Sequence, residues 1–170
     1  MWSSRAVFLS LLLPGAGLPA LAQQALPDKP VSIITNAEAG SVDPAQSMAL
    51  FDQLIAKPMK EALRTLPQAK KRFSAGLKPG ETFYLTTRVV DADGTFEQVF
   101  VQVTQWEDTY VQGTIANTLQ TVRDYTTGQT LEFTTKAVYD WTIMRADGSE
   151  EGNYVGKFLD IQNRLDRLGE

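Results

Sequence analysis

The chain has 170 residues, a net charge of −4, no histidine and no cysteine. Without these two residue types, serine–histidine triads, thiol catalysis and thiolate zinc sites are excluded. The acidic balance disfavours nucleic acid and anionic lipid as partners. Carboxylate, lysine or tyrosine chemistry remains, and we expect no cofactor, no metal site and no catalytic residue.

Residues 1–22 have the three parts of a secretory signal peptide in the correct order. Arg5 supplies the positive charge, an apolar run follows at Ala6–Leu13, and Ala20-Leu21-Ala22 has the small-x-small pattern of a cleavage site. Prolines and glycines cut the apolar run short of a membrane span. Cleavage between Ala22 and Gln23 predicts a periplasmic or secreted protein with no membrane attachment. It also lowers the net charge from −4 to −5, because Arg5 is the only charged residue removed.

The rest of the chain predicts one domain over residues 43–170, preceded by a leader. Residues 23–42 are polar and proline-rich at first and include one short apolar stretch, Val31–Ile34, that could form a strand. Asp43 before Pro44 is a strong helix start, because an N-cap side chain is followed by proline at the first helical position.

Apolar residues then recur at helical spacing as far as Leu66. Pro58 predicts a kink or break near Lys57. A second helix start is predicted at Thr65, where Thr65-Leu66-Pro67-Gln68 fits a capping box, and Gly76 is the predicted stop.

From Glu81 the hydrophobic period changes to two, which predicts strands. Asp93-Gly94 is a hairpin turn signal, and it outweighs the reading of Asp91-x-Asp93 as the start of a calcium loop. A final short helix is predicted to begin at Asp160. Four further strands are predicted before it: Thr95–Trp106, Tyr110–Asn117, a strand from Gly128 onward, and Asn153–Leu159. The expected fold is α+β, a twisted antiparallel meander of about five strands with N-terminal helices on one face and a short C-terminal helix.

Short motifs from Thr65 onward, in a fixed order, resemble the YegJ-like family, a bacterial domain of unknown function found on exported proteins. The motifs are Thr65-Leu66-Pro67, Phe100-Val101, Gly113-Thr114-Ile115-Ala116-Asn117, Gly128-Gln129, Val138-Tyr139-Asp140-Trp141 and Gly152-Asn153-Tyr154. The chain departs from the family where Thr118 and Leu119 replace a proline after Asn117. The resemblance implies the fold and export, and it implies no established reaction.

Three residues are candidate binding residues: Asn117, Asp140 and Trp141. Asp140 could act as a general base or ligand contact beside Trp141 as the wall of a pocket. Alternatively, Trp141 anchors the core and Asp140 binds main-chain amides at a bend. Asn117 could line a cleft or bond its own turn. Likewise, Lys70-Lys71-Arg72 could bind an acidic partner or form a solvated helix end.

Two functional hypotheses follow. The leading one is a non-enzymatic binding or interaction module with an unknown protein partner in the cell envelope, for example an inhibitor or immunity-type protein that uses exposed strand edges and aromatics. The alternative is a small-molecule or envelope-glycan binder, or a carboxylate-dependent hydrolase, that uses Asp140 and Trp141.

Overall fold

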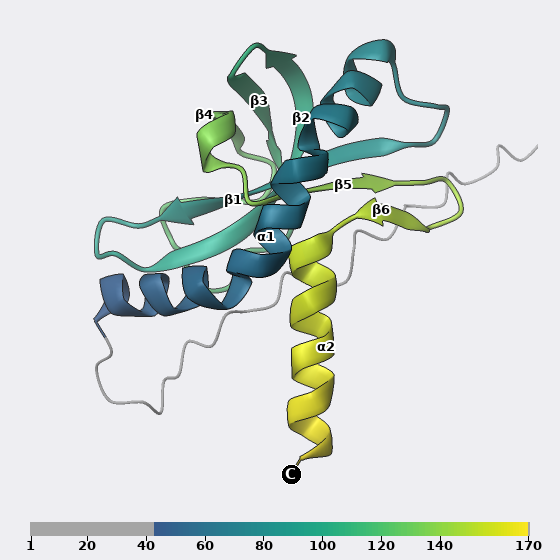
Figure 1. Ribbon diagram of the computed structural model, residues 1–170. Coiled ribbons are helices and arrows are strands. Elements are labelled where there is room, and N and C mark those ends of the chain that lie inside the picture. The colour runs from purple at the N-terminus through teal and green to yellow at the C-terminus, as the bar shows by residue number, and fades with distance from the viewer. Residues whose placement is uncertain (1–42, 170) are drawn as a thin grey trace, which may run out of the picture.

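A computed structural model describes residues 43–169, so the predicted signal peptide and leader lie outside the described residues. A long helix precedes one antiparallel sheet, and a second helix ends the chain (Figure 1). The elements are α1 (Pro44–Ala75), β1 (Thr82–Val90), β2 (Phe96–Glu107), β3 (Tyr110–Ile115), β4 (Thr130–Thr134), β5 (Asp140–Met144), β6 (Glu150–Gly152) and α2 (Tyr154–Leu168). The predicted α+β class is confirmed. No helix within residues 43–169 combines the length and apolar character needed to cross a bilayer.

The sheet has six strands in the order β4-β3-β2-β1-β5-β6, against about five expected. Most strands pair with their sequence neighbours, as in a meander. The exception is β5, which crosses over to pair with β1 instead of β4. The short 3₁₀ turn Thr135–Ala137 interrupts the alternation that had suggested one continuous strand, and Tyr139 N–H then bonds the Thr86 carbonyl of β1.

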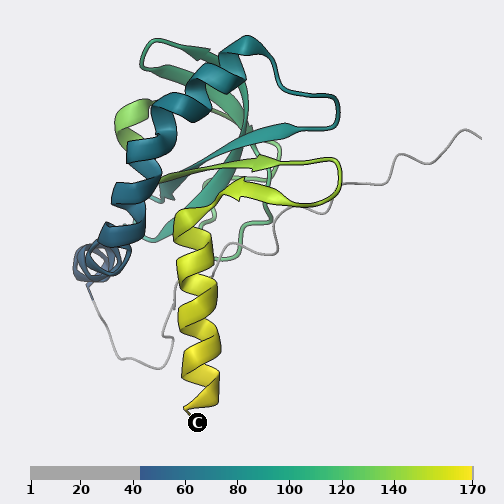
Figure 2. The same cartoon turned by 45° about the vertical axis from the view of Figure 1, so that its right-hand side comes forward.

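Helix α1 begins and ends where the sequence predicts. The Asp43 side chain accepts from the Ala45 amide, Pro44 occupies the first turn, and Gly76 ends the helix at a φ of 95°. Figures 1 and 2 show the N-terminal turns running in a different direction from the rest, in the part of the helix that contains Pro58. Proline removes one helical hydrogen bond and crowds the preceding turn, so a bend there is expected.

The predicted second helix start at Thr65 is wrong, because α1 continues through it. The Thr65 hydroxyl bonds the carbonyls of Glu61 and Ala62 in the preceding turn, as a threonine inside a helix does, and caps no new helix. Ala62 and Ala69 stay buried on either side, so the same helical face packs across this point.

The bent α1 contacts both faces of the sheet. Alternation along β1 and β2 places Phe83 and Leu85 on one side, here called the first face, and Arg88 and Phe96 on the other, the second face. The C-terminal half of α1 packs on the first face through Ala69 and its neighbours. Its N-terminal half packs on the second, where the ring centroids of Phe51 and Phe96 lie 6.4 Å apart.

Helix α2 begins earlier than predicted, and the strand expected over Asn153–Leu159 is wrong. Asn153 adopts a left-handed conformation with a φ of 54° and turns the chain out of β6, so the helix starts at Tyr154. Val155 and Leu159 are four residues apart and both buried, which fits a helix as well as the alternating pattern of a strand. Asp160, the predicted start, lies inside the helix.

Candidate functional site

Asp140, at the start of β5, is buried on the second face and holds the start of α2. Its Oδ1 accepts from the Trp141 N–H at 2.8 Å and its Oδ2 from the Val155 N–H at 2.6 Å, while the residue is 1% exposed. Burial raises the pKa of Asp140 to about 7, against the opposing effect of those two amides. To act as a general base, this carboxylate would have to leave both amides.

Trp141 lies in the largest hydrophobic cluster, on the opposite face from Asp140. Its ring is parallel to that of Phe83, with centroids 6.4 Å apart, and meets Tyr154 edge to face at 6.1 Å. Its Nε1–H donates to the Thr65 hydroxyl at 3.0 Å, so the polar atom is also satisfied inside the protein. The side chain ties β5 to α1.

Asn117 follows β3 and is not brought together with Asp140 and Trp141. Its Oδ1 accepts from the Phe100 N–H at 2.7 Å and its Nδ2 donates to the Thr118 carbonyl, with the residue 5% exposed. The side-chain amide of Asn117 thus extends the contact between β2 and the chain after β3. All three predicted residues have structural contacts that occupy their polar atoms, and a ligand contact by any of them stays a prediction.

Two carboxylates that the sequence analysis did not single out in this role organise the loop over residues 116–129. Glu97 is buried and accepts main-chain N–H groups of Gln120, Thr121 and Val122. Asp91 accepts the N–H groups of Arg123 and Asp124. The sequence indicated only their position, with one acid on each side of the Asp93-Gly94 turn. The structure confirms that turn, in which Gly94 has a φ of 87°.

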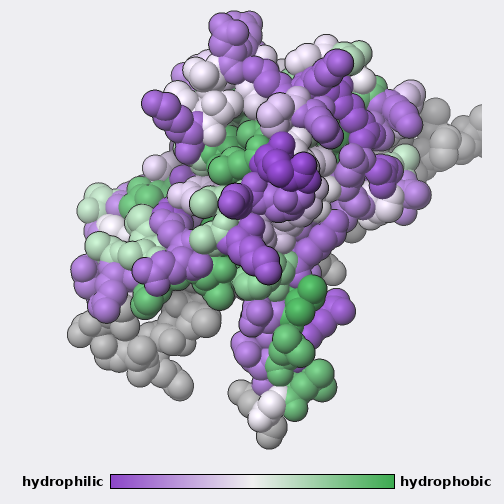
Figure 3. Space-filling view, in the orientation of Figure 1, coloured by the Kyte–Doolittle hydropathy of each residue, from purple (hydrophilic) through white to green (hydrophobic). Residues whose placement is uncertain are grey.

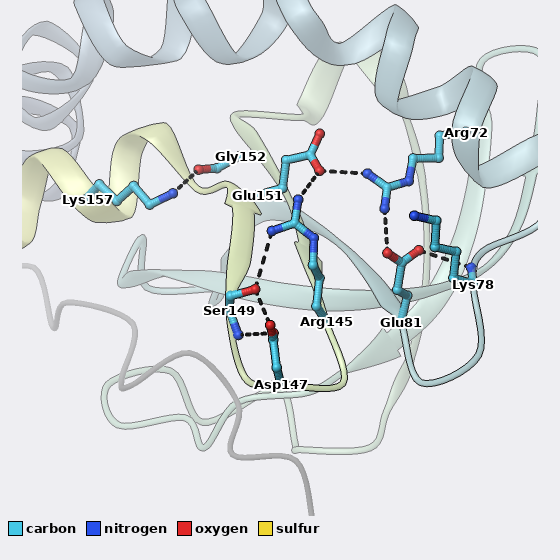
Figure 4. Close-up of polar contacts among 9 residues, drawn as sticks. All are labelled: Arg72, Lys78, Glu81, Arg145, Asp147, Ser149, Glu151, Gly152 and Lys157. Atoms are coloured by element: carbon cyan, nitrogen blue, oxygen red, sulfur yellow. Dashed lines mark hydrogen bonds and ion pairs between the residues drawn. The ribbon is translucent and has the colours of Figure 1, made fainter.

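A charged network joins the end of α1 to Glu81, the residue before β1, and to the β5–β6 hairpin (Figure 4). The Arg72 guanidinium pairs with Glu151 and Glu81, and Glu151 also pairs with Arg145 at 2.6 Å. The hydrogen bond from Arg72 to Glu151 contributes most to raising the pKa of Arg72. Figure 4 shows that the side chain of Arg72 reaches Glu151 from α1 and that the side chain of Arg145 reaches it from the β5–β6 hairpin. These ion pairs connect the hairpin to the end of α1.

Two of the three residues of the predicted basic patch Lys70-Lys71-Arg72 make contacts within this chain. Arg72 serves the network, and the Lys70 ammonium donates to the Asp108 carbonyl and lies 5.2 Å from the Trp106 ring centroid. Binding of an acidic partner by this segment stays a prediction.

Arg88 of β1 lies in an aromatic enclosure on the second face. Its guanidinium carbon is 4.8 Å from the ring centroid of Tyr139, 4.9 Å from that of Phe96 and 5.9 Å from that of Phe51. Both terminal nitrogens bond the Asp52 carboxylate of α1. Asp52 is 45% exposed at its side chain while that of Arg88 is 7% exposed, so the pair bridges the core and the surface.

Exposed large apolar side chains lie on both helices, Leu50, Leu54 and Leu63 on α1 and three residues on α2, of which Leu168 is the most exposed. Ile161 and Leu165 are each 56% exposed and Leu168 is 83% exposed, at the spacing of one helical face. We call these three residues the α2 stripe. Figure 1 shows the second half of α2 extending away from the sheet, and Figure 3 shows apolar side chains along it beside polar ones.

No group of three or more histidine, cysteine, aspartate or glutamate side chains within residues 43–169 is placed to hold a metal ion. The fold itself defines the class of protein: a small α+β domain whose antiparallel sheet is held by a bent N-terminal helix and a C-terminal helix capped from within the sheet.

Comparison with known proteins gives the family. The chain belongs to a bacterial family described as "Uncharacterized protein conserved in bacteria (DUF2314)", whose model matches residues 48–162. No curated protein and no solved structure gives a significant match. The family match ends within α2, so Leu165 and Leu168 of the α2 stripe lie beyond it.

Proposed function

We propose that this protein is an exported, non-enzymatic interaction module of the bacterial cell envelope that binds a protein partner through the α2 stripe. The observation that carries the proposal is the exposure of Ile161, Leu165 and Leu168 on a helix that projects from the domain. Contiguous apolar surface on a soluble domain is costly and commonly marks an interaction site. Export rests on the signal-peptide pattern of residues 1–22, and the YegJ-like resemblance is consistent with it.

The charges beside the stripe favour a protein groove over a lipid surface. Helices that lie on anionic membranes carry a basic polar face. In α2, Asp160 and Asp166 alternate with Arg164 and Arg167, and the chain as a whole is acidic. A partner with an apolar groove would accept the α2 stripe, and a rim of mixed charge on that groove would match the acidic and basic residues beside the stripe. This is helix-in-groove recognition. An inhibitor or immunity-type protein is one form such a module could take.

Site-specific photo-crosslinking in the periplasm tests this function. A photoreactive phenylalanine analogue is placed at Ile161 or Leu165, with Asn163, which is exposed on another side of α2, as the matched control. We expect one protein-sized product from the first two positions and none from Asn163. Equal crosslinking from all three positions, products with lipid or a second copy only, or no product would contradict the proposal.

A further inference from the structure

Strand β4 forms one edge of the sheet, and its outer side is unpaired: within residues 43–169 no strand lies beyond it. Just outside its two ends, the Gln129 carbonyl and the Thr135 N–H bond the segment 109–115, which contains β3. Because bonded and non-bonded residue pairs alternate along an antiparallel ladder, the even-numbered residues between these two direct their main-chain N–H and C=O groups away from β3. They are Thr130, Glu132 and Thr134, and all three are exposed.

The two edges of the sheet differ in how they are protected from further pairing. At the opposite edge, β6 has three residues, and its two glutamates form ion pairs with Arg72, Arg145 and Lys157. β4 has five residues and contains no proline, glycine or lysine. Natural sheets commonly protect a free edge with a very short strand, with lysine or with proline. Because β4 has none of these features, it is suited to accept a further strand.

Two carboxylates on the second face give this edge a negative charge. Register places Glu107 of β2 beside Tyr110 of β3, and Gln112 of β3 beside Glu132 of β4. Glu107 accepts from the Gln105 side-chain amide at 2.8 Å and Glu132 from that of Gln112 at 3.1 Å. Partial desolvation, followed by the nearby Glu132 and Glu107, raises the pKa of Tyr110. No lysine or arginine in the described part of the chain forms an ion pair with either carboxylate, so their charge is available to a partner.

We propose that β4 accepts an added antiparallel strand from a partner protein, in which lysine or arginine alternates with apolar residues. The basic side chains face Glu132 on the second face, and the apolar ones meet Leu131 and Phe133, which are half-buried on the first face. A second copy of this chain fits less well. Symmetric pairing along the whole of β4 would place Glu132 opposite Glu132 of the other copy, and like charges directly opposite each other destabilise a sheet. This surface is separate from the α2 stripe, so the inference goes beyond the proposed function.

Amide hydrogen exchange measured by NMR tests the edge, with the synthetic peptide KVKVKVK as the probe and protein produced from the full 170-residue sequence. Without peptide, the amides of Thr130, Glu132 and Thr134 should exchange at least about tenfold faster than those of Leu131 and Phe133, because only the latter two bond β3. A saturating amount of peptide should slow the first three at least about fivefold. Slow exchange of these three amides without peptide in dilute protein would overturn the proposal, since the edge would already be covered. Protection that is lost on dilution would also overturn it, because the occupant would be a second copy.

Modified peptides separate strand addition from simple charge attraction. A lysine placed opposite Glu132 exchanges both main-chain hydrogen bonds with it, whereas the neighbouring valines direct their N–H groups away from β4. N-methylation of the lysines should therefore abolish the protection, and N-methylation of the valines should change the affinity by less than about twofold. The peptide EVEVEVE should bind at least about fivefold more weakly than KVKVKVK. Equal effects of the two methylations, or equal binding of the two peptides, would contradict the proposal.

A charge reversal in the protein completes the test. Glu132→Lys should weaken binding of KVKVKVK at least about fivefold and strengthen binding of EVEVEVE. The matched control Asp160→Lys changes the net charge equally at an exposed position of α2 and should alter neither affinity by more than about twofold. Equal losses in both variants would mean attraction to the acidic chain as a whole and would overturn the proposal. If Glu132→Lys fails to fold by circular dichroism, the methylated peptides decide with the unaltered protein. None of these measurements uses the α2 stripe, so failure here and failure of the proposed function are distinguishable.

Discussion

Replacing Asp140 by asparagine should change how the free energy of unfolding depends on pH. In the folded protein burial raises the pKa of this carboxyl from 3.8 to about 7. A raised carboxyl pKa means that the folded state binds the proton more tightly than the unfolded state between these two values. This tighter proton binding adds to the free energy of unfolding. The added stability is fully present below pH 3.8 and is lost as the pH rises toward 7. Three pKa units correspond to about 4 kcal/mol, which sets the upper size of the loss.

Asparagine removes the titration but keeps the shape. One main-chain N–H keeps an oxygen acceptor while the other faces an NH₂ group, so we expect a pH-independent cost of about 1–3 kcal/mol. Asp140→Ala leaves the amides of both Trp141 and Val155 without an acceptor and should cost about 2–5 kcal/mol. At pH 4 the free energy of unfolding of Asp140→Asn should be clearly lower than that of the unaltered protein. This difference should shrink or change sign by pH 8.

Urea unfolding followed by tryptophan fluorescence, at intervals from pH 4 to pH 8, measures this difference, because Trp106 and Trp141 are buried. Asp160→Asn is the matched control, because it makes the same side-chain change at an exposed position of α2. Other carboxyls, such as Asp93 and Asp147, have lowered pKa values and affect both proteins alike. Parallel pH profiles for the unaltered protein and Asp140→Asn would refute the reasoning.

Gly152→Ala should destabilise the fold by about 3 kcal/mol or more in thermal unfolding, because the φ of 80° is unfavourable and the new Cβ would lie 2.2 Å from the Trp141 carbonyl oxygen. Gly148→Ala has the same φ with open space around it and should cost about 1 kcal/mol, so equal effects would contradict the steric argument. Glu97→Gln should speed hydrogen exchange of the amides at residues 120–122, because their charge-assisted hydrogen bonds to the carboxylate are lost. The control Glu132→Gln, at an exposed position, should leave this exchange unchanged. Unchanged exchange in Glu97→Gln would show that other contacts hold the loop. Arg88→Lys should lower the free energy of unfolding by about 1–3 kcal/mol in urea, because lysine cannot make the paired contact with Asp52 or stack as a plane; a change below about 0.5 kcal/mol would argue against that role.

Local signals in the sequence predicted the parts of the fold that neighbouring residues determine. Asp43-Pro44 and Gly76 mark the ends of α1, and Asp93-Gly94 marks the first hairpin, because capping and positive φ are properties of a few adjacent residues. Proline at 58 likewise indicated the bend. Two local start signals failed. At Thr65, burial of Ala62 and Ala69 on one face outweighs a capping signal, and Asp160 lies inside α2 rather than at its start.

The errors occur where distant residues decide the structure. The start of α2 is stabilised by Asp140, fifteen positions earlier, and no neighbour of Val155 carries that information. The pairing of β5 with β1 depends on a short crossover that contains neither glycine nor proline to mark it. The same holds for the candidate site: Asp140 and Trp141 were recognised as important, but which face each side chain occupies requires the sheet register.

The bend in α1 has a consequence for how the domain opens. Its two halves pack on opposite faces of the sheet, so one continuous element belongs to the clusters around both Phe83 and Phe51. A helix that separated from one face would strain its packing on the other. Local opening should then be suppressed, and amides in the centre of β1 and β5 should exchange only when the whole molecule unfolds, as a single cooperative unit.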